Sequence, residues 1–195
     1  LVGFESNQTT WISGKIGNAL RFDGVNDWGT IPFTLHDNFT VALWLKSTDA
    51  RGTPPTVWSD HIAILAGPTS TYALMHVNSK FIFWASGSAN LVQESNAQIN
   101  VGSWMHLAAK RENGAGTAGT YSIYVNGTQD KSEVKATQPS TGATLNLGRT
   151  HGGSKYFDGA FDDLRIYDRA LTAAEVKALH DLGSDPLATA TYASP

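Results

Sequence analysis

The chain contains no cysteine, which excludes disulfide bonds, thiolate catalysis and zinc sites built from cysteine. It is also poor in charge: only 16% of the residues are charged, the formal net charge is −3, and no basic tract is present. We therefore expect neither nucleic acid nor an anionic membrane as a partner. No apolar run approaches the ~18 residues of a membrane span, and no signal peptide leads the chain. The abrupt start at Leu1 is typical of a mature product or an excised module.

The abundant residue types indicate one globular β-rich domain. Apolar residues make up 41% of the 195 residues, with six Trp and eight Phe, which is enough for the core of a single domain. Low charge beside many Thr, Ser, Asn and Gly residues is typical of a secreted bacterial β-protein.

Short alternating runs separated by turn residues predict an all-β chain. The run 39–46 alternates most cleanly, so Val41, Leu43 and Leu45 share one face of a strand and the residues between them share the other. Similar patterns predict strands over residues 72–77, 81–84, 104–110, 121–125, 144–147 and 161–167. Asn126 and Gly127 predict a hairpin turn, and residues 113–119 predict a flexible loop between two strands.

One helix is predicted near the end of the chain. Thr172 and Glu175 form a capping box, Val176, Leu179 and Leu182 follow at helical spacing, and Gly183 is expected to end the helix. Residues 184–195 lack a pattern and are expected to form a linker or tail. The predicted fold is therefore all-β. It is a two-sheet antiparallel β-sandwich (jelly roll) over residues 1–183, with one short C-terminal helix.

Several segments occur in the order found in laminin-G-like domains. They are GNALRFDGVND at 17–27, FTVALWLK at 39–46, WMHLA at 104–108, YVNG at 124–127 and FDGAFDDLRIYDRALTAAE at 157–175. Over about residues 1–182 the chain resembles the bacterial LamG-like jelly rolls of the concanavalin A-like lectin/glucanase superfamily. The resemblance implies a β-sandwich with one concave sheet, often a structural calcium ion, and a carbohydrate- or protein-binding role. It also implies a structural role for Trp44 and Trp104.

Two Asp-bearing segments, one near each end of the chain, are candidates for a calcium site. Asp23, Asn26 and Asp27 present oxygen atoms from one turn, and Asp162 adds a carboxylate from the last strand if the fold brings the two ends together. Asp162 shares its parity with Leu164 and Ile166, and a carboxylate on a buried face is costly unless it is paired or metal-bound.

An alternative interpretation involves no metal. Asp23 and Asp27 then only cap turns beside Gly24, while Asp162 pairs with Arg21 or Arg165.

Aromatic and histidine residues in loops are the candidates for ligand binding, because sugar rings place their apolar C–H faces against Trp or Tyr. The alternative for each is ordinary packing of the β-sandwich. The candidates are Trp58 and His61 in the loop 51–61, Trp84 at the end of a strand, and His151 and Tyr156 on either side of two glycines.

Motifs of catalysis are missing. Hydrolases of the resembled superfamily carry paired acids on one strand, and retaining chemistry needs two carboxyl groups about 5–5.5 Å apart. The five glutamates stand singly, at Glu5, Glu94, Glu112, Glu133 and Glu175. The Arg-x-Glu-x-Arg and Gln-x-His strands of jelly-roll lyases are absent, as is a Gly-x-Ser-x-Gly elbow. We therefore predict no catalytic residue.

The leading hypothesis is a non-catalytic carbohydrate-binding module of an extracellular, bacterial polysaccharide-processing protein. Such a module, monomeric by itself, would tether a catalytic domain in the same parent chain to an oligosaccharide or polysaccharide. A protein-binding or adhesion module of the same fold is the second hypothesis. A diverged polysaccharide lyase or glycoside hydrolase is the third.

Overall fold

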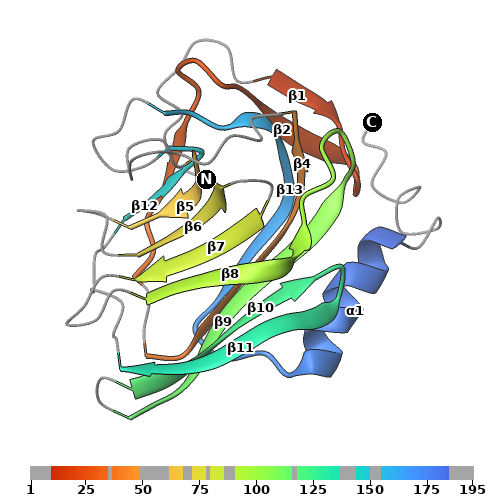
Figure 1. Cartoon of the computed structure of the whole chain (residues 1–195). Helices are drawn as coiled ribbons and strands as arrows, with labels where there is room; N and C mark the ends of the chain where they lie inside the picture. Colours follow the sequence, from red (N-terminus) through yellow and green to blue (C-terminus); the bar gives the residue numbers. More distant parts are fainter. Residues whose placement is uncertain are drawn as a thin grey trace.

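The computed structural model describes residues 10–34, 37–48, 62–67, 72–77, 80–85, 91–115, 118–136, 144–149 and 155–184. Within these ranges, thirteen strands form two antiparallel sheets that face each other, and one helix lies outside the sandwich (Figure 1). The predicted jelly-roll sandwich is confirmed. None of the described helical residues belongs to a segment long and apolar enough to cross a membrane.

The first sheet has seven strands in the order β1-β2-β13-β4-β9-β10-β11. Their bounds are β1 Thr10–Ser13, β2 Asn18–Asp23, β13 Asp158–Tyr167, β4 Phe39–Ser47, β9 Met105–Ala115, β10 Ala118–Val125 and β11 Thr128–Ala136. The last strand therefore lies between two of the earliest, and each pairing is antiparallel. This arrangement brings the two Asp-bearing segments into one sheet, as the calcium hypothesis requires.

The second sheet has six strands in the order β3-β12-β5-β6-β7-β8. Their bounds are β3 Gly29–Ile31, β12 Leu145–Leu147, β5 Ile62–Ala66, β6 Tyr72–Val77, β7 Lys80–Ala85 and β8 Leu91–Gln98. Six strands, β1, β2, β3, β5, β8 and β11, are not predicted from alternation. Three of them have at most five residues, too few for a period-two pattern to stand out.

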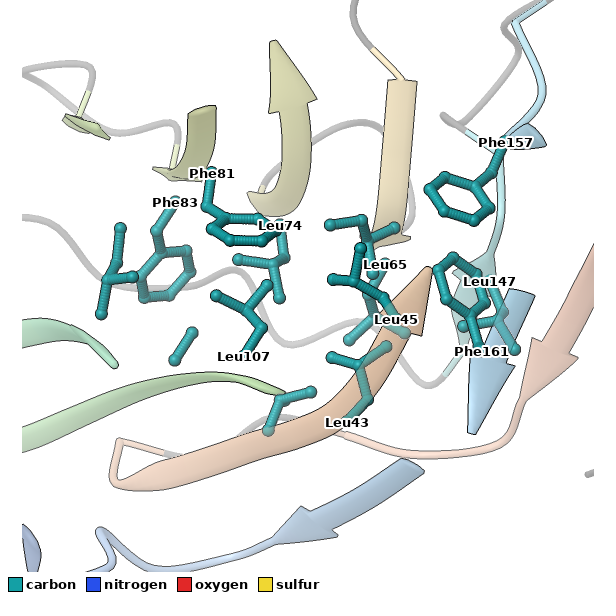
Figure 2. Packing of buried hydrophobic residues seen from close by; sticks show 14 of the residues in the cluster. Leu43, Leu45, Leu65, Leu74, Phe81, Phe83, Leu107, Leu147, Phe157 and Phe161 are labelled. Carbon is teal, nitrogen blue, oxygen red and sulfur yellow. The ribbon is translucent and has the colours of Figure 1, made fainter. Parts of the chain in front are cut away.

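The core lies between the sheets and is built from alternate residues of the strands. Figure 2 shows Leu43 and Leu45 of β4 facing side chains of the opposite sheet such as Leu65. At one end, Phe161 stacks on Phe157 with ring centroids 4.2 Å apart. Val41, Leu43 and Leu45 therefore share one face of β4, as predicted, and that face lies in the core.

The outward face of β4 is buried as well, because helix α1 (Ala173–Ser184) covers it (Figure 1). Ala42 belongs to a second apolar cluster that includes Val176 and Leu179 of α1. The capping box is confirmed: Thr172 Oγ1 accepts a hydrogen bond from Glu175 N, and Glu175 Oε2 accepts one from Thr172 N. The helix is therefore placed by its cap at one end and by its apolar face along its length.

Two local predictions are wrong. Gly183 does not end the helix but lies inside it, buried against the Trp44 indole, while Leu182 is 43% exposed. The region 113–119 is not all loop, because β9 continues to Ala115 and β10 begins at Ala118. The hairpin turn is confirmed by positive φ angles of 50° at Asn126 and 76° at Gly127.

We predict that Gly183→Ala destabilises the protein, although alanine has the higher helix propensity. A Cβ atom at this position would clash with the Trp44 indole ring, and overpacking of this kind costs about 1–3 kcal/mol. The propensity gain is at most about 1 kcal/mol. The free energy of unfolding, measured with urea, should fall, while Leu182→Ala in the same turn should change it by less than about 0.5 kcal/mol. A stabilised Gly183→Ala variant would show that the helix does not sit on Trp44.

Candidate functional site

The turn after β2 is held by its own acidic side chains. Asp23 Oδ1 accepts hydrogen bonds from the backbone N–H groups of Val25 (2.8 Å) and Asn26 (3.2 Å), and Asp27 Oδ2 accepts one from Asp23 N (3.0 Å). Burial opposes the ionisation of Asp23, but these N–H groups outweigh it and lower its pKa. Gly24 allows the turn with a φ of 76°. Asp23 and Asp27 therefore cap the turn beside Gly24, as the interpretation without a metal expects.

Asp162 has a different role, at the hairpin between β1 and β2. Its carboxylate accepts hydrogen bonds from Ile16 N and Asp163 N, each 2.7 Å long, and does not pair with Arg21 or Arg165. Arg165 instead binds both oxygens of Asp163 at 2.9 Å. Burial raises the pKa of Asp162, against the effect of the N–H donors.

The expectation that Asp162 shares a face with Leu164 and Ile166 is wrong. Asp162 pairs with Trp44 on the outward side of β4, and the register then shifts before Arg165. Asp163, at a φ of 46°, is part of this β-bulge. The extra residue returns Leu164 and Ile166 to the core face, where both pack against the main cluster.

The structure therefore brings Asp23, Asn26 and Asp27 together but places Asp162 elsewhere. Asp158 is the residue that pairs with Asp23. Asp162 lies four positions further along the strand, roughly 13 Å away at about 3.3 Å per residue. In the part of the chain that the structure describes, no three acidic or histidine side chains gather closely enough to hold a metal ion.

A buried ring cluster lies next to Asp162, between α1 and the seven-stranded sheet. The Trp44 ring stacks on His180 and meets His106 edge-on, both at 5.3 Å between centroids. The Lys15 ammonium lies 5.0 Å from the Trp44 ring, on the hairpin that Asp162 caps. Burial, with the charges of His180 and Arg165, lowers the pKa of His106 to about 4. These contacts support the structural role expected for Trp44 and place His106 in the same packed cluster.

The predicted ligand-binding residues are only partly visible. Trp58, His61 and His151 lie outside the described residues. Trp84 lies in β7, where its backbone pairs with Ala73 and Val92, but its side chain is not described. Tyr156 is half-buried and forms an isolated bridge with Arg149.

Around Tyr156 the structure assembles a group that we call the loop-end cluster: Trp28, Arg149 and Tyr156. Trp28 directly precedes β3 and Arg149 follows β12, and these strands pair so that Leu147 lies opposite Gly29. The pairing sets the Arg149 guanidinium 3.4 Å from the centre of the Trp28 ring. Sequence reasoning missed Trp28, although it directly follows the acidic turn at 23–27.

The loop-end cluster combines two aromatic rings with one planar cation. All three residues are half-buried. Arg149 Nε is shielded from water and has no hydrogen-bond acceptor among the described residues. The neighbouring Gly148 allows a sharp turn with a φ of 78°, and its N–H donates to Ile64 O at 3.0 Å. Such a cluster can bind a ligand that has an apolar face and hydrogen-bond acceptors.

The chain belongs to the concanavalin A-like lectin/glucanases superfamily, because the family model of that description matches residues 22–177. This match covers most of both sheets and the start of α1. No curated protein sequence is significantly similar to the chain.

Solved structures share this fold at low sequence identity. Domain 4 of a GH43 extracellular arabinanase from Geobacillus stearothermophilus, in complex with arabinotriose, is 23% identical. Its TM-score is 0.72, over 90% of this chain and 82% of that one. The binding domain of a paraclostridial mosquitocidal protein is 13% identical with a TM-score of 0.72, over 91% of this chain and 47% of that one. A heptameric SAP-like pentraxin from Limulus polyphemus is 20% identical with a TM-score of 0.63, over 87% and 84%. At these identities the likeness establishes the fold alone.

The lowered pKa of His106 predicts a loss of stability in mild acid. The folded value of about 4 lies below the ordinary value of 6.5, so protons bind the unfolded chain more tightly. The contribution of neutral His106 is complete above about pH 6.5 and is lost as the pH falls toward 4, by up to roughly 3 kcal/mol. Urea unfolding of the wild type should show this loss, and His106→Phe, which keeps a ring beside Trp44, should reduce it. Equal losses in both proteins would contradict the assignment.

Proposed function

We propose that the chain is a non-catalytic carbohydrate-binding module and that the loop-end cluster is its sugar-binding surface. The observation that carries this proposal is the position of Trp28, Arg149 and Tyr156, half-buried together at the ends of paired strands. Tyr and Trp rings match the apolar C–H faces of sugars, and the guanidinium donates hydrogen bonds to their oxygen atoms. The arabinanase domain with the same fold, in complex with arabinotriose, supports a sugar as the ligand class.

The arabinanase domain, which is part of an extracellular enzyme, also supports a role for this module beside a catalytic domain. In an extracellular polysaccharide-processing protein, the module would hold a catalytic domain of the same parent chain close to its substrate. Binding without chemistry raises the effective concentration of that substrate. The acidic side chains of the two Asp-bearing segments have structural tasks instead of catalytic ones: Asp23 and Asp27 hold a turn, and Asp162 caps a hairpin.

A protein-binding role is the second candidate, and one feature favours it. Trp11 on the edge strand β1 is 60% exposed, and Val25 in the neighbouring turn is 69% exposed. Exposed aromatic and aliphatic side chains at an edge are typical of protein contacts. The fold is also that of the mosquitocidal binding domain.

Binding measured by calorimetry against a panel of oligosaccharides tests the first candidate. We expect Trp28→Ala and Tyr156→Ala each to weaken binding of a retained sugar by about tenfold or more, because each removes a ring worth about 1.4 kcal/mol of contact. Thermal melting identifies any variant that fails to fold, and Trp28→Phe then replaces Trp28→Ala.

Trp11→Ala is the matched control, since it removes an equally large ring from an exposed site outside the loop-end cluster. Binding that depends on Trp11 and not on Trp28 would move the site to the edge strand. No sugar retained at millimolar concentration would overturn the carbohydrate function, and cleavage of a polysaccharide would overturn the non-catalytic assignment.

We further propose that the turn at 23–27 binds calcium through Asp23, Asn26 and Asp27, without Asp162. The turn offers two carboxylates and one amide, and backbone carbonyl groups and water would complete the six to eight oxygens that calcium takes. Few charged ligands imply an affinity on the order of 10⁻⁴ to 10⁻³ M, as in extracellular modules. The bound ion would tighten the turn and take no part in chemistry.

Thermal melting with calcium and with EDTA tests this site. At a tenfold excess over the dissociation constant, calcium should stabilise the fold by about 1.4 kcal/mol, which raises the melting temperature by about 3–6 °C. Asn26→Ala should reduce the rise, because the exposed Asn26 side chain offers an amide oxygen. Asp162→Asn should retain the rise in full. A rise lost in Asp162→Asn, or no rise at all, would contradict the proposed site.

A further inference from the structure

Arg149 differs from the other shielded cations of the chain. Arg111 is fully buried, and its Nε donates to Tyr121 Oη at 3.0 Å. Lys110 is nearly as buried, and its Nζ donates to Leu171 O at 3.1 Å. Arg149 Nε is equally shielded from water but finds no acceptor among the described residues.

An unpaired buried donor has an energetic consequence. Leaving such a group without a partner costs about 1–3 kcal/mol, and more when the group is charged. Native proteins retain few of these groups, and each one calls for a specific explanation. A ligand that supplies the missing acceptor would recover this cost, so the position of Arg149 favours binding of an acceptor-rich group.

The stacking on Trp28 restricts what that group can be. A guanidinium 3.4 Å from the ring centre lies against the ring face, which leaves the in-plane N–H donors to point past the indole edge. This planar fork matches the two oxygens of a carboxylate, and paired N–H···O bonds of this type are among the strongest in proteins. A sugar hydroxyl offers one oxygen and no charge, so it matches the fork less well.

Two nearby carboxylates of the chain, those of Asp23 and Asp27, accept hydrogen bonds from backbone donors. Asp27, which adjoins Trp28, accepts from Asp23 N through Oδ2, and Asp23 Oδ1 accepts from the turn. Lys155 directly precedes Tyr156 and adds a second cation to this end of the molecule. Arg149 and Lys155 are therefore two cations at the end of the molecule that also holds the acidic turn, in a chain whose net charge is −3.

We infer that the loop-end cluster binds glycans that carry carboxylate groups, with Arg149 pairing with the carboxylate of a uronate residue. Trp28 holds the guanidinium in place, and Tyr156 lies on the adjoining bridge to contact the sugar ring. This inference rests on the proposed carbohydrate-binding function and adds the class of sugar to it.

The test compares a short oligogalacturonate, its methyl ester and a neutral arabino-oligosaccharide by calorimetry. We expect the acid to bind at least about tenfold more tightly than its methyl ester, because one charge-assisted pair is worth about 1.5–3 kcal/mol. Arg149→Gln should remove this preference, and Arg149→Lys, which keeps the charge but not the fork, should retain only part of it. Raising NaCl from about 0.05 to about 0.5 M should weaken binding of the acid but not of the ester.

Controls separate the two proposals. Lys131→Gln removes one positive charge from β11, at the edge of the seven-stranded sheet, whereas Arg149 adjoins β12 of the six-stranded sheet, and this change should leave the preference unchanged. Melting curves show whether Arg149→Gln folds, and the methyl ester tests the wild-type protein without any substitution. Equal binding of acid and ester, sensitive to Tyr156→Ala, would overturn the acidic class and keep the carbohydrate function. Binding of none of the three sugars would overturn both for these ligands, and tight binding of an acidic peptide instead would move Arg149 to a protein-binding role.

Discussion

The pairing of β13 with both β2 and β4 is the constraint on which the rest of this structure depends. It places the last strand inside the seven-stranded sheet, so the ends of the described chain are joined by backbone hydrogen bonds. The same pairing sets Phe157 against Phe161 in the core and lets Phe157 O accept from Gly24 N at 3.1 Å. The acidic turn and the loop-end cluster therefore share one end of the sandwich because β13 begins there.

Helix α1 covers the apolar side chains on the outer face of the seven-stranded sheet. Ala42 and Trp44 on the outward face of β4 are apolar, and without a cover they would be exposed to water. The helix buries them with Val176 and Leu179, and Gly183 allows its last turn to approach the Trp44 ring closely. The cost is a histidine, His106, that stays neutral in the interior. The ring cluster thus packs the helix against the sheet, and through His106 it also makes the stability of the fold depend on pH.

The aspartates of the turn at 23–27 and Asp162 of β13 have separate structural roles. Asp23 and Asp27 use backbone N–H groups to fix a surface turn, whereas Asp162 uses them to close a hairpin. A buried donor without a partner lies instead on Arg149, which is stacked on Trp28. The proposed ligand site therefore centres on a cation and aromatic rings, and the acids hold the turns of the scaffold around it.

Local chemistry in the sequence determined the alternation of β4, the turn at Asn126 and Gly127, the helix cap at Thr172 and Glu175, and through them the fold class. Each depends on residues at most a few positions apart, where backbone geometry alone sets the outcome. The face of Asp162 could not be read this way, because a bulge with a positive φ at Asp163 reverses the parity of the strand. The meeting of Trp28 with Arg149 was also decided by the tertiary structure. It results from the pairing of β3 with β12, and which distant strands pair depends on the packing of the whole core instead of on either segment.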